Sequence, residues 1–163
     1  MLTGLPCSAI DIVYSFRNGN AALYLELFET WELLGAKALA AIEGLQFVLL
    51  IQPHPVTNGT NSLGLPAGER ALVLSVVTAT YAHAADDDTV QRAMQAVVDA
   101  HEAVLKREGR YIPFQYLNYA DRSQDPIASY GSDVKARLQT VSKKYDPEGL
   151  FQKAVPGGFK LFP

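Results

Sequence analysis

Residues 9–16 read Ala-Ile-Asp-Ile-Val-Tyr-Ser-Phe, and this alternation decides how the fold begins. The apolar side chains from Ile10 to Phe16 fall on one side of an extended chain, which predicts a half-buried strand. Asn18-Gly-Asn20 then breaks the pattern and offers a helix N-cap, because an Asn side-chain oxygen accepts from the first free amides of a helix. Residues 21–40 carry apolar side chains at helical spacing and predict a long amphipathic helix.

The rest of the chain repeats this succession of strands and helices. Apolar runs predict strands at residues 45–52, 70–82 and 111–119, with a Gly- and Pro-containing loop at residues 54–69. Three acids at 86–88 and Gly109 bound a helix between the last two strands, and a final helix begins at Ser132. The order β-α-β-β-α-β-α predicts the α+β class: an antiparallel sheet with helices on one face, the ferredoxin-like split β-α-β arrangement.

Two of the predicted strands are apolar on both faces. Residues 45–51 form a nearly continuous apolar run, and residues 71–77 do so almost as completely. Strands of this kind usually have both faces covered, whereas the predicted helices cover only one. A bare apolar face of this size is unusual for a monomer. We therefore expect the second face to be covered by a second copy of the chain, sheet against sheet, or by a bound apolar ligand.

Composition limits the classes of function. The 163 residues are 48% apolar and 19% charged with a net charge of −3, so we expect one globular domain over residues 1–163 and no nucleic-acid partner. No apolar run is long enough to span a membrane, and the N-terminus lacks the pattern of a signal peptide, which favours a cytoplasmic location. Cys7 is the single cysteine, so no internal disulfide is expected, and no residue spacing suggests a metal site.

Polar residues on the second sheet face are candidates for chemistry. Asp11 lies opposite the apolar side of its strand, and Gln46 and Gln52 lie at the ends of the next strand. Partial burial of a carboxylate raises its pKa toward the range useful for proton transfer, so Asp11 is a catalytic candidate and the two glutamines are substrate-binding candidates. Arg17 is a partner for Asp11 or for an acidic substrate. The structural alternative is an edge-strand acid in water.

Two histidines have different expected roles. His54 follows a strand end, where pocket mouths form, and is a candidate acid or base because histidine titrates near neutrality. The alternative is a solvated loop histidine. His101 lies on the apolar stripe of the predicted helix between the last two strands, which favours a hydrogen-bonded core histidine.

The C-terminal part carries recognisable motifs. Residues 116–131 read Tyr-Leu-Asn-Tyr-Ala-Asp-Arg-Ser-Gln-Asp-Pro-Ile-Ala-Ser-Tyr-Gly, and residues 141–152 read Val-Ser-Lys-Lys-Tyr-Asp-Pro-Glu-Gly-Leu-Phe-Gln. Together with Asn61-Ser-Leu-Gly-Leu65 and the ending Pro156-Gly-Gly-Phe-Lys-Leu-Phe162, they resemble the C-terminal, substrate-side region of the berberine-bridge-like FAD-linked oxidases, especially the fungal branch. Members of that family are about three times this long, and no segment here resembles their flavin-binding module.

The resemblance implies roles for five residues. It implies that Asn118 supplies an amide to the flavin or substrate and that Tyr116 lines the pocket, so both are catalytic candidates. Tyr119, Asp121 and Asn61 are substrate-binding candidates on the same basis. The structural alternative is a polar cluster that ties down the following loop. FAD belongs to the full-length relatives, and we expect no cofactor on this chain alone, because the flavin carries the redox chemistry.

Three functions remain open from the sequence. The first is a stand-alone, flavin-independent cyclase or isomerase of fungal natural-product biosynthesis, which acts on an apolar, ring-containing molecule through shape and hydrogen bonding. The second is the substrate-binding half of an FAD-linked oxidoreductase that needs a flavin domain in trans. The third is a non-catalytic binding or dimerisation module. The positions of Met1 and Pro163 around the motifs favour a complete unit, and we expect it to be a homodimer.

Overall fold

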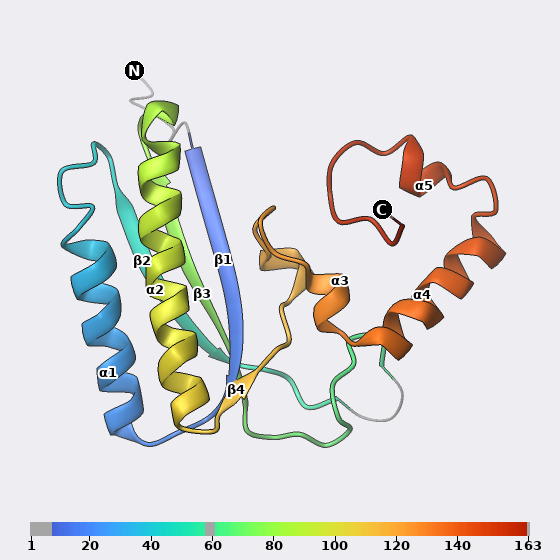
Figure 1. Ribbon diagram of the computed structural model, residues 1–163, viewed down its shortest axis with the longest axis horizontal. Coiled ribbons are helices and arrows are strands. Elements are labelled where there is room, and N and C mark those ends of the chain that lie inside the picture. Colours follow the sequence, from blue (N-terminus) through green and yellow to red (C-terminus); the bar gives the residue numbers. More distant parts are fainter. Residues whose placement is uncertain (1–7, 58–60, 163) are drawn as a thin grey trace.

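The computed structural model describes residues 8–57 and 61–162, so Cys7 lies outside the described residues. Four antiparallel strands form one sheet in the order β2-β3-β1-β4. Figure 1 shows helices α1 and α2 side by side on one face of this sheet. The α+β class and the split β-α-β order are confirmed.

The central strands are long and fully paired. Strand β1 (Ser8–Arg17) pairs with β3 (Leu72–Tyr81) over its whole length, and β3 pairs with β2 (Gln46–Pro53). Side chains alternate between the two faces, so Ile12, Tyr14 and Phe16 reach the helices while Val13 points to the second face. The alternation at residues 9–16 is therefore the pattern that places the core.

Helix α2 (Asp87–Arg107) follows a short 3-10 turn (Ala84–Asp86) and forms the centre of the first core. It buries seven side chains against the sheet: Val90, Met94, Val97, Val98, His101, Val104 and Leu105. Asp86 stands at the N-cap position but makes no side-chain cap bond, whereas Gly109 ends the helix with a φ of 63°, as predicted.

His101 is a structural core residue. It is 0% exposed, with Nδ1 2.7 Å from the Tyr14 hydroxyl and Nε2 2.7 Å from the carbonyl oxygen of Leu27. A carbonyl only accepts, so Nε2 carries the proton and Nδ1 accepts from Tyr14. Burial lowers the pKa of His101 to about 4 and keeps the ring neutral. The prediction of a hydrogen-bonded core histidine is confirmed.

Helix α1 (Ala21–Trp31) is shorter than the predicted helix over residues 21–40. A π-helical turn (Glu32–Ala36) follows it, closed by a bond from the Lys37 amide to the Glu32 carbonyl. A Cβ at Gly35 would collide with the ring of Phe47, and that ring stacks on Trp31 with centroids 5.5 Å apart. Close packing against β2 therefore changes the helix here, which periodicity alone does not reveal.

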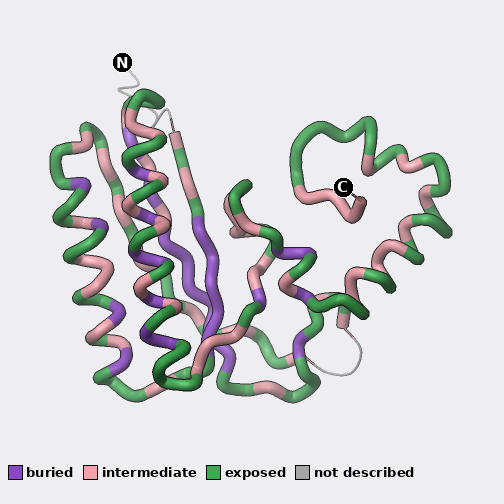
Figure 2. The backbone as a smooth tube through the Cα atoms, viewed as in Figure 1, coloured by how far each residue is buried: buried purple, intermediate pink, exposed green. Residues whose placement is uncertain are grey.

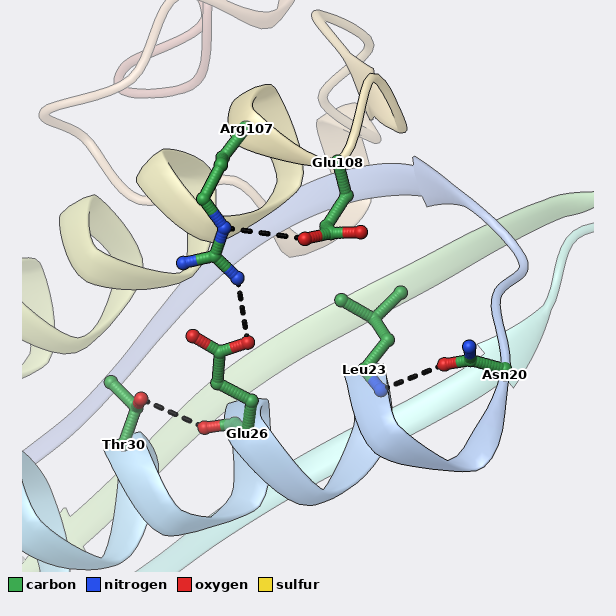
Figure 3. A network of polar contacts seen from close by, with 6 residues as sticks. All are labelled: Asn20, Leu23, Glu26, Thr30, Arg107 and Glu108. Atoms are coloured by element: carbon green, nitrogen blue, oxygen red, sulfur yellow. Dashed lines mark hydrogen bonds and ion pairs between the residues drawn. The ribbon is translucent and has the colours of Figure 1, made fainter.

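Polar contacts fix the start of α1 and its lateral contact with α2 (Figure 3). The Asn20 side chain accepts from the Leu23 amide at 3.1 Å, which confirms the predicted N-cap. Glu26 on α1 receives a bond from Arg107, at the C-terminal end of α2, at 2.7 Å. Since both side chains are exposed, this ion pair orients the helices more than it stabilises them.

The chain itself covers half of the second sheet face. Leu65, Phe114 and Tyr130 pack with Val13 and Leu72 in a second core, together with Leu74 and Val76. The expectation that only a second copy or a ligand covers this face is therefore wrong for this half. Val48 and Leu50 on β2 stay 48% and 40% exposed, so the expectation remains a prediction for the other half.

Strand β4 (Tyr111–Ile112) is much shorter than the predicted strand over residues 111–119. Pro113 follows at once and has no amide to donate, which ends the ladder. A 3-10 turn (Leu117–Tyr119) comes next. The prediction of a strand that continues to residue 119, through Tyr116 and Asn118, is therefore wrong.

The C-terminal arm, residues 132–162, projects from this unit. The short helix α3 (Pro126–Ser129) leads into α4 (Ser132–Tyr145), and α4 and α5 (Leu150–Lys153) extend away from the sheet (Figure 1). Figure 2 shows no buried residue along the arm. No helix in the described part of the chain is long and apolar enough to cross a membrane, and the location of the protein remains a prediction.

Candidate functional site: an open cleft at the edge of strand β1

The early end of β4 leaves part of the β1 edge open. Strand β4 pairs only with Ser15 and Phe16. At Val13 the side-chain amide of Gln124 replaces a strand: it accepts from the Val13 amide at 3.0 Å and donates to the Val13 carbonyl at 2.7 Å. Among the described residues no strand pairs with this edge of β1 beyond that point, from Ser8 to Ile12.

A cleft of about 470 Å³ lies along this open edge. Strand β1 supplies one wall, the turn at residues 118–122 supplies another, and Tyr81, Asp87 and Gln91 contribute from β3 and α2. This volume falls in the range of small-molecule sites, about 300–1,000 Å³. Its lining is mainly polar, unlike the apolar pocket expected from the sequence.

The cleft unites predicted residues from distant parts of the chain. Asp11 lines it from β1, and Asn118, Tyr119 and Asp121 line it from the C-terminal turn. Tyr116 joins them indirectly: its hydroxyl accepts from the Asn118 amide nitrogen at 2.8 Å, and its ring meets that of Tyr119 edge-on at 5.4 Å. The family motif and strand β1 thus meet in one place.

Asp121 and Gln124 hold the turn in position. Asp121 accepts from the Ser123 amide at 2.9 Å and from the Gln91 side chain at 3.3 Å. Gln124, already bonded to Val13, also accepts from the Asp121 amide at 3.1 Å. This part of the structural alternative, a polar cluster that ties down the loop, is therefore present beside the cleft.

Tyr81 and Asp87 form a pair that the sequence did not indicate. The Tyr81 hydroxyl donates to Asp87 at 2.7 Å. Burial, with the nearby carboxylate, raises the pKa of Tyr81 to about 12. The hydrogen bonds from Tyr81 and Ser8, with a smaller contribution from Arg122, lower the pKa of Asp87. Asp87 is therefore a fixed anion in the cleft and Tyr81 a fixed donor.

Asp11 is accessible, and the prediction of a partly buried carboxylate is wrong. It is exposed on β1, beyond the residues with which β4 pairs. Asp11 is thus an open hydrogen-bond acceptor, and the burial argument for proton transfer does not apply.

Besides Tyr116, which reaches the cleft only through Asn118, five predicted site residues lie outside it. His54 is bonded to the Pro55 carbonyl and packs edge-on against Phe114, and Asn61 accepts and donates within its own loop. Arg17 pairs with Glu69 at 3.4 Å. The structure does not bring these residues to the cleft, and Gln46 and Gln52 lie on β2, away from it.

The cleft residues that sequence reasoning missed include Tyr81, Asp87, Gln91 and Arg122. The acids at 86–88 suggested only a helix start, and Tyr81 suggested only a strand end. A run of three acids next to a strand-terminal tyrosine was the available signal, but the fold alone brings it opposite residues 118–122. The three carboxylates of the cleft do not form a metal-binding group within the described residues.

The lining of this cleft does not fit FAD, the cofactor that the resemblance implies. A dinucleotide diphosphate needs cations or a free helix N-terminus. Here three carboxylates, Asp11, Asp87 and Asp121, face a single guanidinium, Arg122. The first turn of α2 carries Asp87 and Asp88 where an anion would bind. A flavin that works at this cleft has to be held mainly by other residues.

The family comparison agrees with the motifs. Residues 115–155 match the family described as "Berberine and berberine like". The resemblance to berberine-bridge-like oxidases is confirmed. This berberine-like segment contains Tyr116, Asn118 and Asp121 of the site and all of helix α4.

Known fungal proteins share longer stretches. The FAD-dependent monooxygenase tpcD of Cochliobolus heterostrophus is 40% identical over 105 residues, which cover 64% of this chain and 20% of that protein. The oligopeptidase PhomG' of Diaporthe leptostromiformis is 34% identical, over 82% of this chain and 12% of its own. The bifunctional solanapyrone synthase of Alternaria solani is 33% identical, over 74% and 24%.

The chain spans a quarter or less of the length of these relatives, between 12% and 24%. Their similarity therefore concerns one region of much longer polypeptides. It supports a relationship to enzymes of fungal natural-product pathways and leaves the reaction of this chain open.

Proposed function

We propose that this chain is the substrate-side part of a berberine-bridge-like, FAD-linked oxidoreductase that acts on a ring-containing fungal natural product. In this role it binds and orients the substrate, while a flavin-holding polypeptide supplies the redox chemistry. The observation that supports this most is the meeting of Asp11 with Asn118 and Asp121 in one open cleft. Because the cleft is open on one side, it suits a site that the flavin-holding polypeptide completes.

The polar groups have distinct tasks in this proposal. The Asn118 amide nitrogen is committed to the Tyr116 hydroxyl, so the amide is held in one orientation and its oxygen is available to a substrate donor. Asp11 accepts from a substrate hydroxyl or amine, because its carboxylate is exposed. Asp87 and Asp121 add negative charge, so a neutral or cationic substrate is favoured over an acidic one.

A flavin-independent cyclase or isomerase is the second candidate. Its support is the ligand-sized volume of the cleft and a relative named bifunctional solanapyrone synthase. The polar, open lining makes it the weaker candidate, because catalysis by shape needs a site that excludes water. A non-catalytic binding or dimerisation module predicts instead that no cleft residue matters beyond stability.

Binding is tested with the purified chain and a panel of hydroxylated aromatic and polyketide natural products. Amide chemical-shift changes in a two-dimensional NMR spectrum should cluster at residues 9–11 and 118–122. Asn118→Ala should weaken binding by about tenfold through loss of one hydrogen bond, and Asp11→Asn should do so through loss of the negative charge that strengthens another. Asp99→Asn, an exposed acid on the outer side of α2, is the matched control and should leave binding unchanged.

The candidates are separated by incubating a bound compound with the chain alone and analysing it by mass spectrometry. The proposal expects unchanged compound and a colourless protein. An isomer of the same mass, formed without flavin, would favour the cyclase. Oxidised product from the chain alone, with a flavin absorption spectrum, would contradict the division of roles. Binding that ignores both cleft variants would favour the non-catalytic module.

A further inference from the structure

Strand β2 has an open outer edge. It is the first strand in the order β2-β3-β1-β4, and within the described residues no strand pairs with its outer side. The Leu50 carbonyl accepts from the Ser75 hydroxyl of β3 at 2.9 Å, and the amide of His54 bonds to the Leu72 carbonyl. The backbone amides and carbonyls of the even-numbered residues of β2 therefore point toward β3. By alternation, those of Phe47, Leu49 and Ile51 point outward.

Within residues 8–57 and 61–162, this edge lacks the features that usually prevent strand addition. Natural edges carry charged side chains, bulges or covering loops. The sequence of β2, Gln-Phe-Val-Leu-Leu-Ile-Gln-Pro, has no charge, and only Pro53 at its end is protective. Val48, Leu50 and Ile51 are 48%, 40% and 37% exposed. The opposite edge of the sheet differs, because β4 and the Gln124 side chain occupy part of it.

The stretch of the β2 edge that can pair with another strand is limited at both ends. On one side, Pro53 has no amide to donate. On the other side, the Leu45 amide already bonds to the Ile42 carbonyl at 3.4 Å. Between these two limits, Phe47, Leu49 and Ile51 are the residues whose backbone amides and carbonyls point outward. Leu49 is the central one. A strand that pairs antiparallel with a copy of itself about Leu49 uses all three.

We propose that two copies of this chain associate through the outer edges of β2, antiparallel about a two-fold axis at Leu49. Leu49 then faces Leu49 of the partner subunit, and Phe47 faces Ile51 of the partner subunit. Each such pair exchanges two backbone hydrogen bonds, about six in total. The two sheets become one continuous sheet.

The side chains fit this register. On the second face Val48 comes opposite Leu50 of the partner subunit, and on the helix face aromatic Phe47 comes opposite β-branched Ile51 of the partner subunit. Apolar and aromatic cross-strand pairs are favourable, and no like charges meet. The interface is isologous, so it closes after two copies and does not propagate. The cleft at β1 lies at the other side of the sheet and stays open.

The mass in solution is the first test. Light scattering after gel filtration should give a dimer for the wild-type chain. Val48→Lys places two new charges in the interface and should weaken association by about tenfold or more. Val141→Lys is the matched control, because Val141 is also 48% exposed but lies on α4. It should remain a dimer. Circular dichroism checks that both variants fold.

Hydrogen exchange of the wild-type amides tests the register without any variant. Protection of Phe47, Leu49 and Ile51 should rise with protein concentration, whereas Val48 and Leu50, bonded to β3, should be protected throughout. A wild-type monomer at high concentration would overturn the proposal. A dimer in which the Leu49 amide exchanges freely would overturn it too, since the contact would then be sheet against sheet or through the arm.

Discussion

Helices α2 and α4 carry similar apolar stripes and have opposite environments. Helix α2 buries seven side chains in the first core, while α4, over 14 residues, buries none. Val134 and Leu138 of α4 touch the second core, but Val141 and Tyr145, further along the same stripe, are 48% and 74% exposed. The apolar stripe of α4 therefore continues past the last position that other described residues cover.

This difference shows that amphipathic periodicity predicts a helix and its apolar side. It does not predict whether the residues that bury this side belong to the same chain. For α2 the cover is the sheet formed by neighbouring strands. For α4, which lies within the berberine-like segment, the described chain offers only a partial one. Stability should therefore be concentrated in the sheet and its two helices.

The largest expected effect separates the two regions directly. Leu105→Ala in α2 should lower the free energy of unfolding by about 3 kcal/mol, because it leaves a cavity in a closed core. Leu150→Ala in α5 should change it by less than about 0.5 kcal/mol, since Leu150 is already 58% exposed. Urea unfolding followed by circular dichroism measures both. Equal losses would mean that the arm packs as tightly as the core.

The pH dependence of the first core comes next. The pKa of His101 falls from 6.5 to about 4 in the folded protein, so the unfolded chain binds more protons between these values. Neutral His101 makes its full contribution to the free energy of unfolding above pH 6.5. This contribution, about 3 kcal/mol at most, is lost as the pH falls toward 4.

His101→Gln is the reference for that measurement, because glutamine does not titrate. The difference in unfolding free energy between wild type and variant should narrow as the pH falls through this range. A constant difference would show that His101 is not the titrating group. The arm contributes no buried histidine, so this signature belongs to the core alone.

A pair of glutamines tests the comparison at the level of single hydrogen bonds. Gln124 bonds to both backbone groups of Val13 beside the cleft, whereas Gln139 on α4 donates to the Leu161 carbonyl within the arm. Gln124→Ala should cost about 2 kcal/mol of unfolding free energy, and Gln139→Ala less than about 0.5 kcal/mol. Thermal or urea unfolding measures both losses. A smaller loss for Gln124→Ala would show that the hydrogen bonds from Gln124 to Val13 are not needed to stabilise the β1 edge.

The smallest effect should come from the exposed contact between α1 and α2. Arg107→Gln removes the ion pair with Glu26 (Figure 3) and should lower the unfolding midpoint slightly, and less at high salt. Arg92→Gln, on the outside of α2, is the control and should show no salt-dependent difference. A large loss that persists in high salt would show that the pair does more than orient the helices.

Part of the site could be predicted from the sequence. The motif at residues 116–121 indicated Asn118, Tyr119 and Asp121, and strand alternation indicated Asp11. The error over residues 111–119 followed from reading an apolar run as a strand, although Pro113 ends the ladder after Ile112. Tyr81 and Asp87 were missed because their bond depends on where β3 ends relative to α2.

The sequence by itself determined the local elements, their order and the family motif, because side-chain periodicity and turn residues act between near neighbours. Only the tertiary structure decided which edges stay open, how the second sheet face is shared, and which polar residues meet at the cleft. These depend on contacts between segments such as Val13 and Gln124, which are 111 positions apart in the chain. A local sequence pattern does not predict how many residues of a strand are paired when a distant segment bonds to the same edge.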